Sequence, residues 1–405
     1  MRDTTYHALN RRQLLQVSAA GALATGLAIT HLPVGAQEAT PLAQDVADGF
    51  SPEIQLALHQ IVERNLAATE TPGALIGVWY PGQGTWQHAA GVADLETGAP
   101  VTLDDHVRIA SNTKTFVATV VLQLVDEGLV GLDDPIEDYV PGIPNGTTIT
   151  VRQVLGMNAG IADFIAVPEI AAEYAANPLI TMTPDEILAW IRESSPDFAP
   201  GAQVHYSNSN YVILGFLIEA VTGQSPEKEI ATRLIAPLGL TGTSFPLTPF
   251  MPEPVMHGYF AENLGDPLID VTRSNPGFPW TSGAMISTLA DIHTWVEALA
   301  TGSTLLSAAT LAERNTWNAL VPNSSVASYG LGILSFRGFL GHNGGIAGYS
   351  SWMLHNPDNG FTVVIVVNRA GEKGGTADPF LGEILQLFPE AVAEPTAAPA
   401  ATPAA

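Results

Sequence analysis

The pattern of apolar and polar positions predicts strands near both ends of the chain and helices between them. Residues 52–68 repeat apolar side chains at helical spacing, with Ser51 as the N-cap and Pro52 in the first turn. The next two runs, GALIGVWYPG and GTWQHAAGVAD, predict a β-hairpin that turns at residues 81–84.

The middle of the chain, residues 129–290, predicts mostly helices joined by long loops. Cap residues and stop glycines mark where these helices begin and end. The expected helices are one from the Thr150–Gln153 capping box to Gly160, TPDEILAWIRES, SNYVILGFLIEAVTG ending at Gly223, and one from a Ser287 cap to Gly302.

After residue 328 the pattern changes to strands. SYGLGILSF, GYSSWMLHNP and GFTVVIVVN read as three strands, and DPFLGEILQLF predicts a terminal helix. Strands at both ends predict an α+β fold, in which an antiparallel β-sheet is flanked by helices and carries an inserted helical domain. We expect a sheet domain of residues 37–115 and 290–388 and a helical domain of residues 116–289.

Residues 112–127 are apolar almost all round, which is typical of a helix buried on every side, and Gly128 ends the run. Just before it, in RIASNTKTF, Ser111 precedes Lys114 by three places, and the chain has only three lysines. Side chains at this spacing share a helix face. Either Ser111 is an ordinary helix cap near a stray charge, or burial lowers the pKa of Lys114 so that it takes the serine proton.

The Ser-x-x-Lys spacing alone is not specific, because Ser225 and Lys228 share it. Ser225 follows the helix stop at Gly223 and precedes Pro226, which is the signature of an N-cap. We therefore expect Ser225 to cap a helix and Lys228 to be an exposed charge.

Two further stretches carry residues suited to catalysis. Tyr206 and Asn208 come just before a helix, and His342 and Gly344 lie at the edge of an expected strand. Taken singly, the first pair is typical of a turn with an Asx cap, and the second of a structural histidine in a bulge or hairpin.

The order of these motifs resembles the serine β-lactamase / penicillin-binding protein superfamily, especially its branch of class C β-lactamases, D-alanyl-D-alanine carboxypeptidases and esterases. The resemblance covers about residues 50–388. RIASNTKTF is similar to the first motif, YSNSNYVILGFLIEAVTG to the second and GHNGGIAGYSS to the third. VLGMNAGIADF and ISTLADIHTW are similar to two further blocks of the family. The resemblance implies the β-lactamase/transpeptidase-like form of the α+β fold.

The same resemblance implies a serine hydrolase that forms an acyl-enzyme on Ser111. Lys114 would lie within hydrogen-bond reach of the nucleophile, and Tyr206, as phenolate or phenol, would exchange protons with it and with the leaving group. We expect the Lys114 ammonium to favour the Tyr206 phenolate, so that the two act as a coupled base. Arg108 and His205, which adjoin these motifs, are expected to be structural.

For substrate binding the resemblance implies Asn208, His342, Gly344 and Gly345, with Asn208 also orienting the lysine. The backbone N–H groups of Ser111 and Gly345 would form the oxyanion hole. No metal or organic cofactor is expected for this chemistry.

The third motif departs from class C β-lactamases, which carry Lys-Thr-Gly where this chain has His342, Asn343 and Gly344. The change removes a permanent cation that would hold a substrate carboxylate. We therefore expect a hydrolase of small esters, amides or D-peptides, with weak or absent β-lactamase activity. The alternatives are a β-lactamase proper, a penicillin-binding sensor without turnover and a structural surface protein. The sequence has no Gly-x-Ser-x-Gly elbow and no His-Glu-x-x-His zinc motif.

The composition and the two ends of the sequence bear on the binding partners and the location of the protein. With 15 basic and 40 acidic residues the net charge is -25, which would repel nucleic acid, and the absence of cysteine excludes disulfides. Residues 1–36, with paired Arg11 and Arg12 and a Val-Gly-Ala end, resemble a twin-arginine export signal; the alternative is an uncleaved membrane anchor. We expect an exported protein without stable membrane insertion after cleavage, ending in a disordered Ala/Pro-rich tail at residues 389–405.

Overall fold

The computed structural model describes residues 45–392 except 168–169, 171–178, 180–181, 262, 321–326 and 371–375. The export signal predicted for residues 1–36 lies outside these residues, as does the part of the predicted tail beyond residue 392.

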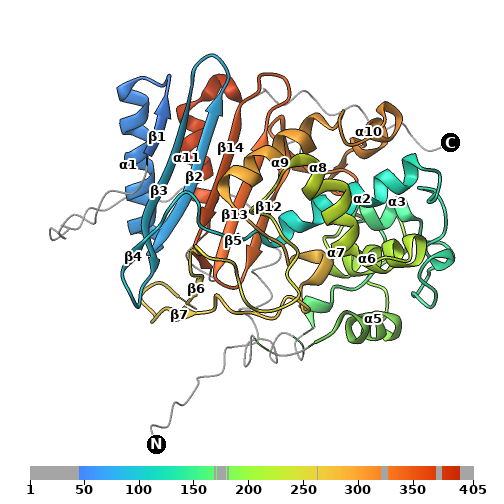
Figure 1. Ribbon diagram of the computed structural model, residues 1–405. Coiled ribbons are helices and arrows are strands. Elements are labelled where there is room, and N and C mark those ends of the chain that lie inside the picture. The colour runs from blue at the N-terminus through green and yellow to red at the C-terminus, as the bar shows by residue number, and fades with distance from the viewer. Residues whose placement is uncertain are drawn as a thin grey trace, which may run out of the picture.

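Within the described residues, ten strands form one sheet in the order β1-β3-β2-β14-β13-β12-β11-β10-β9, with β4 beside β3 (Figure 1). Its strands are β1 (Asp45–Asp48), β2 (Gly73–Tyr80), β3 (Gly84–Asp94), β4 (Ala99–Pro100), β9 (Asn318–Ala319), β10 (Ala327–Tyr329), β11 (Leu334–Phe336), β12 (Phe339–Ile346), β13 (Tyr349–His355) and β14 (Thr362–Val367). All pairings are antiparallel, and β2 pairs directly with β14, with Ile76 opposite Ile365. The two ends of the chain therefore build one sheet, and the predicted α+β fold is confirmed.

Helices cover both faces of this sheet, so its central strands are buried on both sides. Along β14, Val363, Ile365 and Val367 pack with helices α1 (Pro52–Thr69) and α11 (Asp378–Leu387). The alternate residues Val364 and Val366 belong to the core on the other face, which includes α9 (Leu289–Thr301). A run of six buried β-branched or small side chains, TVVIVV, is what such a two-sided position requires.

The remaining elements lie outside this sheet, most of the helices among them at the right of Figure 1. They are β5 (Val107–Arg108), η1 (Ala110–Asn112), α2 (Thr113–Asp126), η2 (Ile136–Asp138), α3 (Val151–Leu155), η3 (Phe164–Ala166), α5 (Pro184–Glu193), α6 (Asn208–Thr222), α7 (Pro226–Ile230), η4 (Ala231–Ile235), α8 (Ala236–Leu238), β6 (Tyr259–Phe260), β7 (Ile269–Asp270), η5 (Trp280–Ser282), β8 (Ile286–Ser287), α10 (Ala308–Arg314), β15 (Arg369–Ala370) and η6 (Pro389–Ala391).

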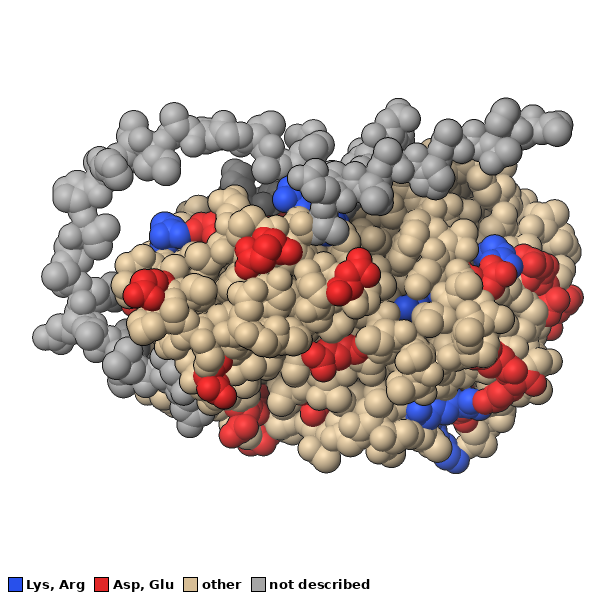
Figure 2. All heavy atoms as spheres, turned by 90° about the horizontal axis from the view of Figure 1, so that it is seen from above, with Lys and Arg blue, Asp and Glu red and all other residues tan. Residues whose placement is uncertain are grey.

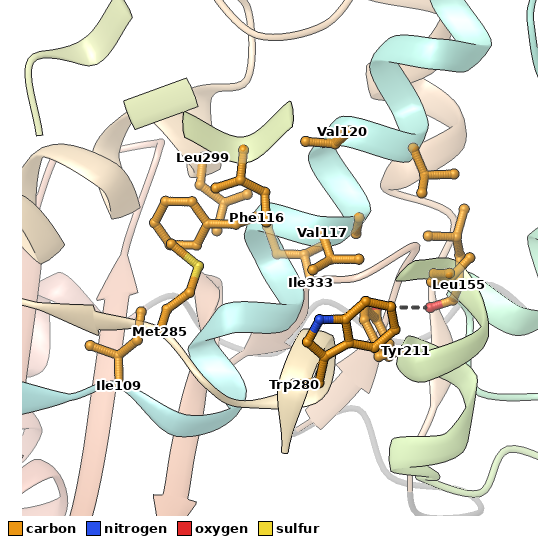
Figure 3. Packing of buried hydrophobic residues seen from close by; sticks show 14 of the residues in the cluster. Ile109, Phe116, Val117, Val120, Leu155, Tyr211, Trp280, Met285, Leu299 and Ile333 are labelled. Carbon is orange, nitrogen blue, oxygen red and sulfur yellow. Dashed lines mark hydrogen bonds between the residues drawn. The ribbon is translucent and has the colours of Figure 1, made fainter. Parts of the chain in front are cut away.

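Helix α2 lies at the centre of the larger core, as its apolar sequence predicted. Phe116, Val117 and Val120 of this helix are fully enclosed. Figure 3 shows them among side chains from many elements, namely Ile109, Leu155, Tyr211, Trp280, Met285, Leu299 and Ile333. The N-terminus of α2 is thereby held rigidly against the rest of the molecule.

Several predicted boundaries are confirmed and four are wrong. Ser51 caps α1, the hairpin at residues 81–84 forms, and Gly223 ends α6 in a left-handed conformation. The capping box of Thr150 and Gln153 is present, but its helix ends at Leu155 instead of Gly160. The physical reason is the left-handed backbone of Met157, with φ of 61°, which a helix cannot continue through.

The other corrections concern the second half of the chain. The cap of α9 is Thr288, because Ser287 belongs to strand β8. SYGLGILSF forms two strands, β10 and β11, because a turn at Gly332 with φ of 80° separates them. The run from Phe339 to Ile346 is a further full strand, β12.

Near the C-terminus, the packed fold extends past the predicted tail boundary. Residues 389–391 form η6, and the buried Ala391 accepts hydrogen bonds from the side chains of Asn356 and Asn359. None of the helices in the described part of the chain is both long and apolar enough to cross a lipid bilayer.

Candidate active site

Ser111 sits in a short turn, η1, that leads from strand β5 into helix α2. The preceding residue, Ala110, has a φ of 49°, a left-handed conformation that is uncommon without glycine. The backbone around it is held on both sides, because the Ile109 N–H donates to the Met285 carbonyl over 3.0 Å and the Ile109 carbonyl accepts from the Asn112 side chain over 2.8 Å. Ser111 is partly exposed, whereas Asn112 is buried, so the turn leaves the serine accessible on a fixed backbone.

Strand β12 lies directly against this turn at Gly344. A Cβ atom there would lie 2.4 Å from the Ile109 carbonyl oxygen and 2.6 Å from Ser351 Oγ. Glycine is therefore needed at residue 344 so that β12 can approach the nucleophile turn. Gly345, the next residue in the strand, is partly exposed beside it.

Lys114 is fully buried, and its ammonium nitrogen reaches three oxygen atoms. Nζ lies 3.0 Å from Ser111 Oγ, 2.8 Å from Asn208 Oδ1 and 2.7 Å from the Ser282 carbonyl oxygen. The last two oxygens can only accept hydrogen bonds. A neutral amine would direct its two N–H groups to them and leave its lone pair for the hydroxyl of Ser111.

The protonation of Lys114 suits that arrangement. Burial lowers the pKa of Lys114 to about 7, and the nearby carboxylate of Asp163 opposes this shift. A substantial fraction of the lysine is therefore neutral at pH 7. The sequence left open a helix cap near a stray charge or a buried lysine of lowered pKa beside the serine. The structure has the second arrangement.

Tyr206 lies beside this pair, with its ring centroid 4.9 Å from Lys114 Nζ. Burial raises the pKa of Tyr206 well above its usual value, although the Ser111 hydroxyl is near enough to favour the ionised form. Of the two forms expected for Tyr206, the raised pKa favours the neutral phenol. Because Lys114 itself loses its proton near neutral pH, its charge does little to favour the phenolate. Within the described residues, the buried phenol oxygen has no partner that meets hydrogen-bond geometry.

His342 is buried next to Tyr206, with the two ring centroids 6.2 Å apart. Its Nδ1 donates to the Asn343 carbonyl, which leaves Nε2 to accept from the Tyr329 hydroxyl over 3.1 Å. Burial, together with the charge of Lys114, lowers the pKa of His342 to about 3. The imidazole is therefore neutral at physiological pH, and both of its nitrogens are occupied by protein groups.

Asp163 is a site residue that the sequence reasoning missed. Its two carboxylate oxygens accept from the backbone N–H and the side-chain amide of Asn208, over 3.2 and 3.1 Å. The available signal was its place in VLGMNAGIADF, one of the two further family blocks. Nothing in that block indicates contact with a residue 45 positions later.

Arg108 and His205, which were expected to be structural, lie outside the cluster around Lys114. Arg108 is buried and donates to the carbonyls of Pro249, Thr272 and Ser274, which is a structural role. His205 lies at the surface with Nδ1 3.6 Å from an Asp197 carboxylate oxygen.

The second Ser-x-x-Lys pair is a helix cap. Ser225 caps α7 by accepting from the Lys228 N–H, and the Lys228 side chain reaches Gln224 at the surface. The structure thus gathers Ser111, Lys114, Tyr206, Asn208, His342 and Gly344 in one place and leaves Ser225 outside it.

Comparison with known proteins agrees with the resemblance of the three motifs. The sequence profile of the family described as Beta-lactamase matches residues 58–386. Protein flp of Staphylococcus aureus (strain COL) is 27% identical over 325 residues, which is 78% of this chain and 64% of that protein. The chain thus spans somewhat less than two thirds of the length of this relative.

Two solved structures are similar over almost their whole length. A D-stereospecific amidohydrolase from Streptomyces sp. is 34% identical, with a TM-score of 0.73 over 80% of this chain and 97% of that one. The D-amino acid amidase from Ochrobactrum anthropi SV3, in complex with L-phenylalanine amide, is 26% identical, with a TM-score of 0.73 over 84% and 99%. The chain therefore belongs to the beta-lactamase family, the group of serine hydrolases that its three motifs indicated.

Proposed function

We propose that this protein hydrolyses the amide bond of small D-amino acid derivatives through an acyl-enzyme on Ser111. The observation that carries the proposal is the 3.0 Å contact between the hydroxyl of the partly exposed Ser111 and the buried Lys114, whose pKa burial lowers to about 7. The similarity to a D-stereospecific amidohydrolase and a D-amino acid amidase supports the choice of substrate class.

In the first half of the reaction, neutral Lys114 takes the proton of Ser111 as Oγ attacks the amide carbon. The developing oxyanion is received by the backbone N–H groups of Ser111 and Gly345. The phenol of Tyr206 then gives its proton to the leaving amine and is reprotonated from Lys114. Each proton is accounted for, and the enzyme is left as an ester with Lys114 neutral.

In the second half, water attacks the ester carbon and the same groups act in reverse. Lys114 takes the proton of the water, and the phenol of Tyr206 gives its proton to Ser111 Oγ as the ester bond breaks and is reprotonated from Lys114. The product is a free carboxylic acid, and the starting form of the enzyme is restored. Asn208 holds Lys114 throughout through its side-chain oxygen.

The neutral His342 bears on substrate choice. A substrate carboxylate on this side would meet no cation, because His342, which stands in place of the lysine of class C enzymes, is buried and neutral and has both nitrogens bound to protein groups. We therefore expect uncharged amides and esters to be better substrates than β-lactams or peptides with a free C-terminal carboxylate.

We further propose that the protein is exported by the twin-arginine route and cleaved after residue 36. The paired arginines and the small-residue end of this segment support the proposal. N-terminal sequencing of the protein from culture medium or cell envelope should give a start near Gln37. A start at residue 1 in the membrane fraction would instead support an uncleaved anchor.

Nucleic acid is not proposed as a partner. The net charge is -25, and Figure 2 shows acidic side chains spread over one face, with the few basic ones mostly beside them. Such a surface repels phosphate backbones.

A substrate panel tests the function. It compares D- and L-amino acid amides, p-nitrophenyl esters, D-alanyl peptides and a chromogenic cephalosporin, each with the wild type and with Ser111→Ala. We expect D-amides to be cleaved faster than their L-forms and all turnover to be lost in the variant. Hydrolysis of the cephalosporin in preference to every amide would instead identify a β-lactamase. Acylation of Ser111 by a penicillin without release of the product would instead identify a penicillin-binding sensor.

A further inference from the structure

Asp163 is a partly buried carboxylate that takes no part in the steps above, and its contacts all run to backbone N–H groups or to Asn208. Oδ1 accepts from the backbone N–H of Asn208 over 3.2 Å and from that of Ile165 over 3.3 Å. Oδ2 accepts from the side-chain Nδ2 of Asn208 over 3.1 Å. All three contacts place an N–H donor on a carboxylate oxygen, so Asp163 fixes the nitrogen end of the Asn208 amide toward itself.

The oxygen end of the amide is thereby turned to Lys114. Asn208 Oδ1 lies 2.8 Å from Nζ, and the Ser282 carbonyl accepts from the same nitrogen over 2.7 Å. With two pure acceptors in place, the lone pair of the neutral amine is left for Ser111. If the amide turned over, its NH₂ group would face Lys114 and compete for that lone pair.

We propose that Asp163 is a positioning residue for the reaction, which holds the Asn208 amide so that the Lys114 lone pair points at the Ser111 hydroxyl. The inference rests on the proposed function in that Lys114 is taken as the base. It assigns a role to a residue that touches neither the substrate nor the reacting atoms.

The charge of Asp163 gives this role a signature in the pH profile. Burial raises the pKa of Asp163, and its hydrogen bonds from Asn208 and Ile165 and the charge of Lys114 oppose this shift. The other groups that face Lys114 are uncharged near pH 7: the rings of Tyr206 and Tyr211, with centroids 4.9 and 5.6 Å from Nζ, and the neutral His342. Asp163 raises the pKa of Lys114 against the larger effect of burial. Removing the carboxylate should therefore lower the pKa of Lys114 further and extend the active form to lower pH.

The test uses Asp163→Asn, which keeps the shape but offers an NH₂ group where the carboxylate accepted. Two rates are followed from pH 5 to 9: inactivation by a fluorophosphonate and kcat/KM for a D-amino acid amide. We expect a loss of about 10- to 100-fold at pH 8, which is part of the 10²–10⁴ that general base catalysis contributes. We also expect the acidic limb of both profiles to move to lower pH.

A double-mutant cycle separates positioning from a general structural effect. In an Asn208→Ala background, Asp163→Asn should cause little further loss, because the path through the amide is already gone. Asp163→Glu, which keeps the charge, should leave the acidic limb near its wild-type position. The matched control is Asp134→Asn, whose carboxylate accepts from the Gly131 N–H and the Tyr139 hydroxyl and makes none of the contacts of Lys114; it should leave the limb unmoved.

Equal losses in both backgrounds, or an acidic limb that stays in place in Asp163→Asn, would overturn the proposal. If Asp163→Asn does not fold, Asp163→Ser takes its place with the same two expected results. Fluorophosphonate labelling needs no natural substrate, so a wild type that is labelled but inactive on D-amides refutes only the substrate class. A folded wild type that is not labelled on Ser111 refutes the proposed function and this inference together.

Discussion

The side-chain amide of Asn112 donates to the Ser351 hydroxyl over 2.8 Å and so ties the turn that carries Ser111 to strand β13. The two residues are 239 positions apart, and both are buried. The position of the nucleophile thus depends on a sheet that the end of the chain completes.

Ser351→Ala should therefore affect catalysis more than stability. Loss of one buried hydrogen bond is expected to reduce the free energy of unfolding by about 1 kcal/mol. Freer movement of the turn should lower kcat/KM by roughly tenfold, because small misplacements of a nucleophile are costly. Ser350→Ala, on the same strand, is the matched control, since Ser350 Oγ accepts from the N–H of Ala377 at the start of α11. Urea unfolding and amide hydrolysis should show similar stability for the two variants and a rate defect only in the first.

Gly344→Ala should disrupt the site through the contact of β12 with the nucleophile turn. The new Cβ would lie 2.4 Å from the Ile109 carbonyl oxygen, so strand and turn must separate. Overpacking of this kind typically costs about 1–3 kcal/mol, and we expect activity to fall at least tenfold. Gly382→Ala in α11, where a Cβ meets nothing within 4 Å, should be neutral or slightly stabilising. Wild-type activity in Gly344→Ala would mean that the turn tolerates displacement.

Tyr206→Phe should separate attack from departure of the leaving group. Because burial keeps the phenol protonated, its expected task is to donate a proton to the amine. We expect kcat for amides to fall by about 10²–10⁴. Labelling of Ser111 by a fluorophosphonate, whose leaving group needs no proton, should slow much less. The control is Tyr349→Phe, whose hydroxyl is also buried but donates to the Met256 carbonyl. Equal losses in both assays would assign Tyr206 to activation of the nucleophile instead.

The low pKa of Lys114 should make the free energy of unfolding depend on pH. Its pKa falls from 10.5 to about 7 on folding, so between these values the unfolded chain binds more protons. The contribution of Lys114 to stability is therefore least favourable below pH 7 and improves as the pH rises toward 10.5. The difference in unfolding free energy between wild type and Lys114→Met should rise with pH in this window, by up to roughly 1.4 kcal/mol per pH unit. Urea titrations from pH 6 to 10 measure it, and a flat difference would place the lysine pKa elsewhere.

Much of the fold could be predicted from local pattern. Ser51, Gly223 and Ser225 mark helix ends by chemistry confined to a few residues, and the structure confirms all three. Strand β12 was harder, because His342, Asn343, Gly344 and Gly345 interrupt its apolar alternation. It becomes a strand through its neighbours β11 and β13, which a single stretch of sequence does not show.

In the site, too, features set by nearby residues could be predicted and features set by distant elements could not. Ser111 and Lys114 could be identified because a spacing of three positions at the start of one helix is enough to bring their side chains into contact. The ionisation of Tyr206 could not, because burial by distant elements outweighs any neighbour visible in the sequence. Asp163 was missed for the same reason, since its role depends on Asn208, which only the folded chain brings to it.

The measurement that tests the central claim most directly is the rate of fluorophosphonate labelling against pH, with the modified residue identified by mass spectrometry. A single adduct on Ser111, formed at a rate that rises through about pH 7 as Lys114 loses its proton, is the predicted result. An adduct on Ser225 or on no serine of the folded protein, or a rate that does not depend on pH between 5 and 9, would contradict it.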